Sequence, residues 1–183
     1  MYRQLTAFAL FVSISAIAAE TKIYADTNDS AKIYTSFIDD WTGKQKDPIN
    51  IAIKADAPTE DELKEFSECS GNSNWGSVEQ INDLTGLIGS LSYVHLVDPN
   101  NWSPNDPEKL IANGQSVDTA VKNSFNSGLG SFSAIAFNKS HTLAAFSFSF
   151  VCGSLCGNGR IVIFKRTSTG WVQADKQCGG WVS

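Results

Sequence analysis

The sequence has little of the chemistry on which most enzymes depend. Histidine occurs only twice in 183 residues, as His95 and His141, although it is the side chain that most often transfers protons near neutral pH. No GxSxG elbow, HExxH pair, Walker loop or dinucleotide-binding glycine pattern is present. These absences exclude the enzyme classes that carry those motifs. We therefore expect a non-enzyme, with catalysis by an unrecognised site left open.

Neither histidine has a partner at catalytic spacing. His95 lies in an expected strand, where its side chain could face either way. His141 follows Ser140 in an expected turn, and neighbours in a turn do not form a nucleophile–base pair by spacing alone. A surface or core position is the simpler interpretation of both residues.

Clusters of basic residues and long hydrophobic runs are also missing. The 14 Lys and Arg residues are outnumbered by 19 Asp and Glu residues, which gives a net charge of −5. Nucleic acids and anionic membranes attract clustered basic side chains, so we expect neither as a partner, whereas a cationic partner is compatible. The apolar run Leu5–Ile17 is shorter than the roughly 20 residues of a spanning helix, and we expect no membrane insertion.

Residues 1–19 are typical of an export signal. Arg3 supplies the positive charge, the apolar run follows, and Ala16-Ile17-Ala18 places small residues where signal peptidase reads them. Cleavage is expected after Ala18 or Ala19. Removal of this segment deletes Arg3 and no acid, so the net charge changes from −5 to −6. The sequence therefore predicts a periplasmic or secreted product.

The four cysteines are best interpreted as two disulfides. Export would place Cys69, Cys152, Cys156 and Cys178 in an oxidising compartment. The close pair has three intervening residues instead of the two of a redox CxxC motif, and one close pair alone does not match a zinc site. We expect no metal and no cofactor. The residues favour Cys152–Cys156 and Cys69–Cys178, and the pairing Cys69–Cys152 with Cys156–Cys178 remains open at this point.

The N-terminal half carries the hydrophobic period of helices. Four apolar residues share one face of a helix predicted over residues 28–41: Ile33, Phe37, Ile38 and Trp41. Thr59 and Glu62 form the capping-box pattern of a second helix, which is expected to stop near Gly71. Further helices are predicted over residues 77–89, 107–112 and 116–125, the last with an apolar side of Val117, Ala120, Val121 and Phe125. Short strands are expected at Ile49–Ile53 and Ser92–Val97.

The last third changes to the period of strands. In Leu143–Val151, three phenylalanines alternate with Ser147 and Ser149, which is typical of a sheet with one buried face. We predict an antiparallel meander of about four strands over residues 131–183. The N-terminal helices would pack on it to form one α+β domain over residues 20–183. The expected core positions of this meander are Phe146, Phe148, Phe150, Ile161, Ile163 and Trp171.

One loop is a candidate recognition site. Residues 98–106 are polar, contain two prolines and include a tryptophan. Such a loop could form a recognition edge or a platform that stacks on carbohydrate. The candidate residues are Asp98, Asn101, Trp102 and Asp106. The alternative, which we favour, is a structured connection with Trp102 against the core.

The C-terminal strands resemble a known family. Cys152-Gly-Ser-Leu-Cys-Gly-Asn-Gly159 lies between aromatic strands and is followed by Gly170-Trp171-Val172 and Trp181-Val182-Ser183. This combination resembles a family of uncharacterised exported bacterial proteins that share a CGxLCG turn and a Trp-Ile/Val-Ser ending. Its members often carry the two CGxLCG cysteines without the others, so the resemblance implies that Cys152 and Cys156 form a self-contained pair. It implies location and fold more than function.

Export, acidity and the missing catalytic motifs favour a non-catalytic binding protein, of an inhibitor or immunity type, with an envelope protein as its partner. One alternative is an envelope hydrolase that uses His95 or His141 with acids such as Asp98 or Asp106. A second alternative is a structural envelope component without a discrete ligand. The sequence does not predict the oligomeric state.

Overall fold

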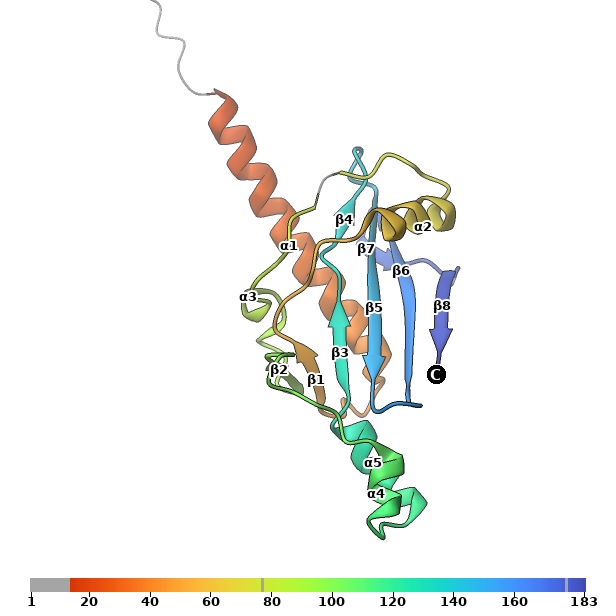
Figure 1. Cartoon of the computed structure of the whole chain (residues 1–183). Coiled ribbons are helices and arrows are strands. Elements are labelled where there is room, and N and C mark those ends of the chain that lie inside the picture. The colour runs from red at the N-terminus through yellow and green to blue at the C-terminus, as the bar shows by residue number, and fades with distance from the viewer. Residues whose placement is uncertain (1–13, 77, 177) are drawn as a thin grey trace, which may run out of the picture.

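A computed structural model describes residues 14–76, 78–176 and 178–183, with side chains from Asp26 onward (Figure 1). Residues 1–13 of the expected export signal lie outside this description. The helices are α1 (Ile14–Thr42), α2 (Glu60–Ser70), α3 (Thr85–Ile88), α4 (Pro107–Ala112) and α5 (Val117–Asn126). The strands are β1 (Ile49–Ala52), β2 (Val94–Val97), β3 (Leu129–Phe132), β4 (Ala136–Phe137), β5 (Leu143–Val151), β6 (Gly157–Thr167), β7 (Gly170–Gln173) and β8 (Cys178–Val182). None of the described helices has the length and apolar character needed to cross a membrane.

The strands form one mixed sheet in the order β2-β1-β3-β5-β6-β7, in which β4 also pairs with β5 and β8 with β6. β1 runs parallel to both β2 and β3, whereas the other pairs are antiparallel. The predicted mixture of helices and strands is confirmed. The meander predicted over residues 131–183 has more strands than the expected four, since β4 to β8 and half of β3 lie there, and the strands expected at Ile49–Ile53 and Ser92–Val97 extend the same sheet as β1 and β2. β1 is buried along its whole length, as is typical of an interior parallel strand.

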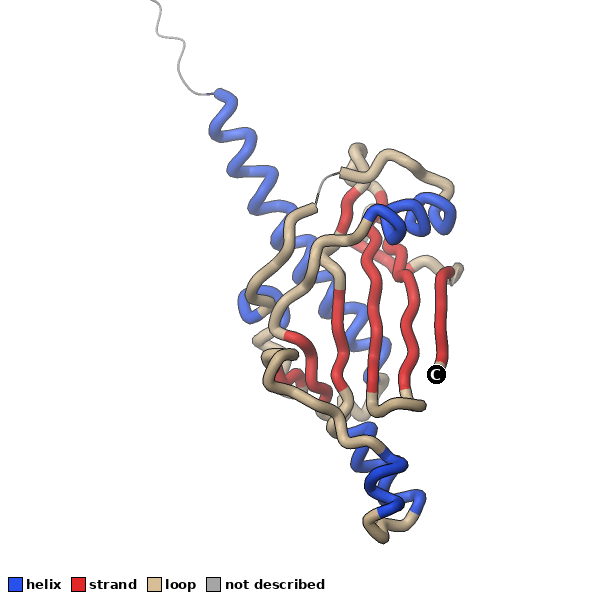
Figure 2. Tube along the Cα trace, viewed as in Figure 1, coloured by secondary structure: helices blue, strands red, loops and turns tan. Residues whose placement is uncertain are grey.

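Helices cover the two faces of the sheet unequally. α1 crosses one face along much of its length, and α2 lies over one end of the other face (Figures 1 and 2). α4 and α5 form a hairpin that projects beyond the end of the sheet. Among the described residues, no helix covers the rest of the face on which α2 lies (Figure 1).

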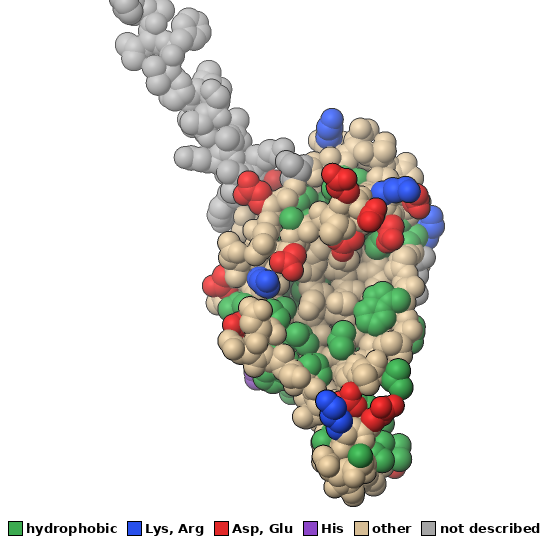
Figure 3. All heavy atoms as spheres, in the orientation of Figure 1, with side chains coloured by type: hydrophobic (Ala, Val, Ile, Leu, Met, Phe, Trp, Pro, Cys, Tyr) green, Lys and Arg blue, Asp and Glu red, His purple; other side chains and the backbone are tan. Residues whose placement is uncertain are grey.

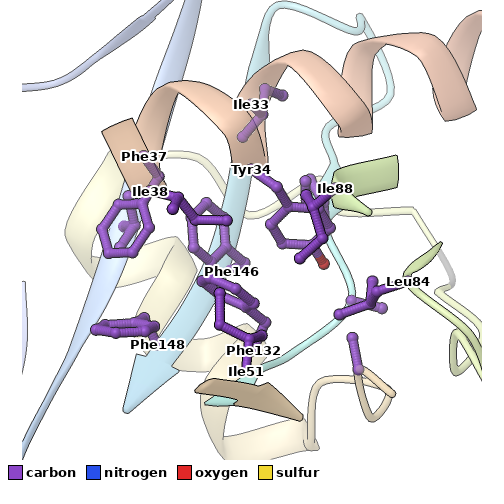
Figure 4. Packing of buried hydrophobic residues seen from close by; sticks show 14 of the residues in the cluster. Ile33, Tyr34, Phe37, Ile38, Ile51, Leu84, Ile88, Phe132, Phe146 and Phe148 are labelled. Atoms are coloured by element: carbon purple, nitrogen blue, oxygen red, sulfur yellow. The ribbon is translucent and has the colours of Figure 1, made fainter. Parts of the chain in front are cut away.

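The main core lies between α1 and the sheet. The helix predicted over residues 28–41 is confirmed within α1, and its apolar side chains point onto the phenylalanines of β3 and β5 (Figure 4). The Phe37 ring is fully buried, with its centroid 5.3 Å from that of Phe146 and 4.8 Å from that of Phe148. The alternation in β5 is also confirmed, since all three of its phenylalanines face α1.

A second cluster lies beneath α2. Phe66 and Cys69 pack against Ile161 and Ile163 of β6, which are core positions as expected. The capping box at Thr59 begins α2, and Gly71 ends it in the left-handed conformation. The middle of β6 is thus buried on both faces, because Val162 and Phe164 belong to the main core. Trp171 is half-buried at the edge of the main core.

Two helix predictions need correction. The helix over residues 77–89 is wrong, since within the described residues of that segment only Thr85–Ile88 is helical. Ala55 and Ile81 instead exchange both backbone hydrogen bonds at 2.8 Å, so the segment follows the sheet as an extended strap. The helix predicted over residues 116–125 is confirmed, but its apolar side is not its buried side: Ala120 is buried, whereas Val117, Val121 and Phe125 are exposed.

The two disulfides are Cys69–Cys178 and Cys152–Cys156. This is the pairing that the residues favoured, and the alternative pairing is excluded. The first bond joins the end of α2 to β8 across 109 positions of sequence. The second closes the short turn between β5 and β6.

Tyr34 should make stability sensitive to alkaline pH. Its hydroxyl is fully buried and donates to the Ser133 carbonyl at 2.7 Å. Burial raises the pKa of Tyr34 far above its ordinary value of about 10. The unfolded chain releases this proton near pH 10 and the folded chain keeps it, so the stabilisation is complete below about pH 10 and is lost as the pH rises further.

Urea unfolding between about pH 8 and pH 11 checks this expectation. Tyr34→Phe should lower the free energy of unfolding by about 1 kcal/mol at neutral pH through the lost hydrogen bond. The substitution should also reduce the fall in the free energy of unfolding that we expect above about pH 10. Tyr93, whose pKa burial and Asp39 raise to about 12, contributes to the remaining slope. An unchanged slope in Tyr34→Phe contradicts the prediction.

Candidate functional site

His141 is held between two carboxylates of α1. Its Nδ1 lies 3.3 Å from Asp26 Oδ1, and its Nε2 lies 3.1 Å from Asp29 Oδ2. The ring stacks on Phe137 with centroids 4.4 Å apart. Arg166 Nη1 also approaches Asp29 Oδ2, at 3.3 Å. These contacts tie the α1 helix to the turn before β5.

This geometry leaves His141 poorly placed as a general base. A base needs a free ring nitrogen within hydrogen-bond reach of the proton that it takes, and both nitrogens face carboxylates. The neighbouring Ser140 hydroxyl lies 2.9 Å from the Thr142 hydroxyl and accepts from the Asn138 amide. Among the described residues, no group of three or more His, Cys, Asp or Glu side chains could hold a metal ion. The contacts of His141 are therefore suited to stabilising the fold.

His95 is exposed on β2 at the edge of the sheet. Within the described part of the chain, no hydrogen bond or ion pair joins it to Asp98, Asp106 or another acid. The structure therefore does not assemble the histidine–acid pairs that a hydrolase would need from these residues.

The candidate recognition loop uses its polar side chains internally. Asp98 accepts from the Asn100 backbone at 2.9 Å and from the Asn101 amide at 2.7 Å. Trp102 is half-buried, and its indole nitrogen donates to the Ser127 carbonyl at 2.9 Å. These contacts are those of a structured connection.

Asp106, at the end of the same loop, caps α4 and also accepts from the Ser154 backbone at 3.3 Å. The hydrogen bonds from Ser154 hold the pKa of its carboxyl below the usual range. Asp106 therefore joins the start of α4 to the turn that Cys152 and Cys156 close.

A cavity of about 690 Å³ lies beside His141. It is bounded by the start of the described α1 side chains, the strap before α3 and the segment around β4. Its apolar wall residues are Val78, Ile81, Leu87, Ala134, Ile135 and Phe137. The volume falls within the range of small-molecule pockets. Its polar wall includes Asp26 and His141, which already bind each other.

A second hollow, of about 600 Å³, lies on the sheet face that α2 covers at one end, and we call it the serine groove. Its floor consists of Ser131, Ser133, Ser147 and Ser149, and Trp181 forms part of its wall. Figure 3 shows this face, with acidic side chains gathered above the hollow near α2. The serines of β5 point here because its phenylalanines point to α1.

One row of residues crosses the floor of the serine groove. Ser131 pairs with Ser149, Ser149 with Gly159, and Gly159 with Trp181. The indole of Trp181 lies directly on Gly159, where a Cβ would collide with the indole nitrogen. The side chain remains 47% exposed. No described residue bonds the hydroxyls of Ser131 or Ser149, so two free hydroxyls lie beside an aromatic ring.

The charged side chains that reach the serine groove are acidic. Glu62 is bound on both oxygens, since it accepts from the Ser147 hydroxyl at 2.5 Å and from the Thr59 backbone at 2.7 Å. Glu65 has no partner among the described residues, and a Cβ on Gly179 of β8 would lie 3.0 Å from its Oε2. An unpaired carboxylate thus lies next to the strand that carries Trp181.

Arg160 also contributes to the wall of the serine groove, but its guanidinium lies 5.2 Å from the centroid of the Phe37 ring, on the α1 face. Its positive charge is therefore turned away from the floor serines.

Sequence reasoning missed the serine groove. The alternation in β5 indicated a second face, but the row across the floor depends on strand order and register, which the sequence does not show. The alternating Gly157 and Gly159 were the available signal. Both lie in β6 under the Trp181 ring.

Comparison with family models, curated proteins and solved structures found no match. Membership of the CGxLCG family therefore stays a prediction, and the functional argument depends on the geometry of the serine groove.

Proposed function

We propose that this chain is a non-catalytic binding protein that works outside the cytoplasm and holds an envelope protein partner in the serine groove. The two disulfides support this location, because such bonds persist in oxidising compartments. The chain would bind this partner in the way that an inhibitor or an immunity protein binds its target.

The observation that carries the proposal is the row of Ser131, Ser149 and Trp181. Free hydroxyls can donate to and accept from a partner backbone. An exposed indole offers a large contact area with a polar handle, which is why tryptophan is enriched at binding sites. These groups lie on paired strands of the sheet, so backbone hydrogen bonds fix their relative positions.

The charge of the serine groove supports a basic segment as the part of the partner that binds. A Lys or Arg side chain over the Trp181 ring would gain a cation–π contact of about 0.5–2 kcal/mol. Glu65 is the nearby unpaired carboxylate to which such a cation could bind. The net charge of −5 would also steer a basic partner toward the protein.

Calorimetric titration with short serine–glycine peptides that carry lysine, arginine or glutamate tests the proposal. The oxidised protein, expressed without residues 1–19, should bind the basic peptides in preference to the acidic peptide, and less tightly at high salt. Trp181→Ala should weaken the binding of basic peptides about tenfold, which corresponds to about 1.4 kcal/mol. Glu65→Gln should weaken it several-fold.

Two variants serve as matched controls. Val182→Ala removes the neighbouring side chain of β8, and Glu108→Gln removes the same charge as Glu65→Gln, but on α4. Neither control should change the affinity for the basic peptides by more than about twofold. The proposal fails if all three peptides bind alike, or if Trp181→Ala behaves like Val182→Ala.

A further inference from the structure

The second helix of the projecting hairpin presents an apolar stripe to solvent. Val117, Val121 and Phe125 follow one another at intervals of four residues along α5 and share one side of it. Their exposed fractions are 61%, 51% and 51%. The buried side of α5 consists of Ala120 and Ser124. Soluble monomers rarely expose contiguous apolar surface of this kind without a binding role.

The stripe contains a hollow, which we call the socket, that could receive a side chain of another helix. A hollow of about 390 Å³ is lined by Asp118, Val121, Lys122 and Phe125, together with Asn126. The first four residues have the spacing i, i+3, i+4 and i+7. In helix–helix packing, four residues of one helix form the hole that receives a knob from the facing helix.

We propose that this socket is the contact surface for a second copy of the same chain, with the two α5 helices antiparallel about a two-fold axis. Val117 and Val121 of each copy would supply the knobs. An antiparallel pairing brings Asp118 of each copy near Lys122 of the other copy, so both ion pairs form at once. A parallel pairing would place like charges together, which is unfavourable.

The size of α5 sets the expected strength of the dimer. Its ten residues span only about 15 Å, so the contact is smaller than a standard protein–protein interface. The dimer should therefore be reversible and depend on concentration. The projection of the hairpin beyond the sheet leaves α5 accessible to another copy (Figure 1). This inference does not depend on the serine groove.

Sedimentation velocity over a concentration series tests the proposal. The wild-type protein should shift from monomer to dimer as its concentration rises toward the millimolar range. Val121→Glu should raise the dissociation constant at least tenfold. Val172→Glu is the matched control, because this valine on β7 is also 51% exposed and should leave the association unchanged. Circular dichroism melts confirm that both variants fold.

Charge exchange tests the antiparallel direction. Asp118→Lys and Lys122→Asp should each weaken the dimer, because each places like charges opposite one another, and the double variant should restore it. The proposal is overturned if the wild type stays monomeric throughout, if Val172→Glu weakens association as much as Val121→Glu, or if the double variant is no better than the single ones.

Discussion

Replacing both Cys69 and Cys178 with alanine should lower the free energy of unfolding by up to about 5 kcal/mol. The bond joins residues 109 positions apart, and in the chain-entropy model a loop of that length stabilises the folded state by nearly this amount. It also holds α2 and β8 together around Ile161. Urea unfolding of the oxidised wild type and of the double variant measures the difference.

The second disulfide provides the comparison for this result. Cys152 and Cys156 close a loop with a separation of four, for which the same model gives about 2 kcal/mol. Replacing that pair with alanine should therefore destabilise the protein by less than half as much. An equal or reversed order of the two effects would show that loop length does not govern their contributions.

Phe37→Ala should cost about 3–5 kcal/mol of unfolding free energy. The ring is fully buried between α1 and the sheet, against Phe132, Phe146 and Phe148. Its removal leaves a cavity that rigid neighbours cannot fill. It also removes the ring over which the Arg160 guanidinium lies. Denaturant unfolding followed by far-UV circular dichroism measures the loss.

Phe125→Ala is the matched control for this substitution, because it removes the same ring from a position that is half exposed. The Phe125 ring makes some packing contacts, since its centroid lies 5.0 Å from that of Phe150. We therefore expect its removal to lower the free energy of unfolding by about 1–2 kcal/mol. If both variants lose the same free energy, the core is not centred between α1 and the sheet.

The elements that were predicted correctly are those whose signal is local. The helix around Phe37 follows from apolar spacing within four turns, and Leu143–Val151 is the predicted strand with unchanged bounds. The capping residue Thr59 likewise acts within three positions of itself. Each of these patterns requires no knowledge of the rest of the fold.

The missed features depend on contacts between distant segments. Nothing local in Ile49–Ala52 shows that it pairs with β2 and β3 at once, so the sequence predicts this strand but not its place in the sheet. Ile81 has helical spacing with its neighbours, but pairing with Ala55 satisfies its backbone in an extended form. Tertiary contacts override local preference in such cases.

The candidate site shows the same difference between local signals and contacts of distant segments. Trp102 was recognisable as a tryptophan in a polar loop, yet its indole bonds to Ser127 within the chain. Trp181 became a candidate only when the register placed it beside Ser149 and Gly159. Sequence patterns can indicate which face of a strand is polar, but not which residues of other strands share that face.

The contacts of α1 also bear on how the chain folds during its synthesis. Tyr34 bonds to Ser133 across 99 positions, and Asp29 to His141 across 112. High contact order of this kind slows folding, because the loops between the partners must close first. The N-terminal half therefore cannot complete its core until β3 and β5 have left the ribosome. Until then α1 lacks the phenylalanines of β3 and β5 against which Phe37 packs in the folded chain.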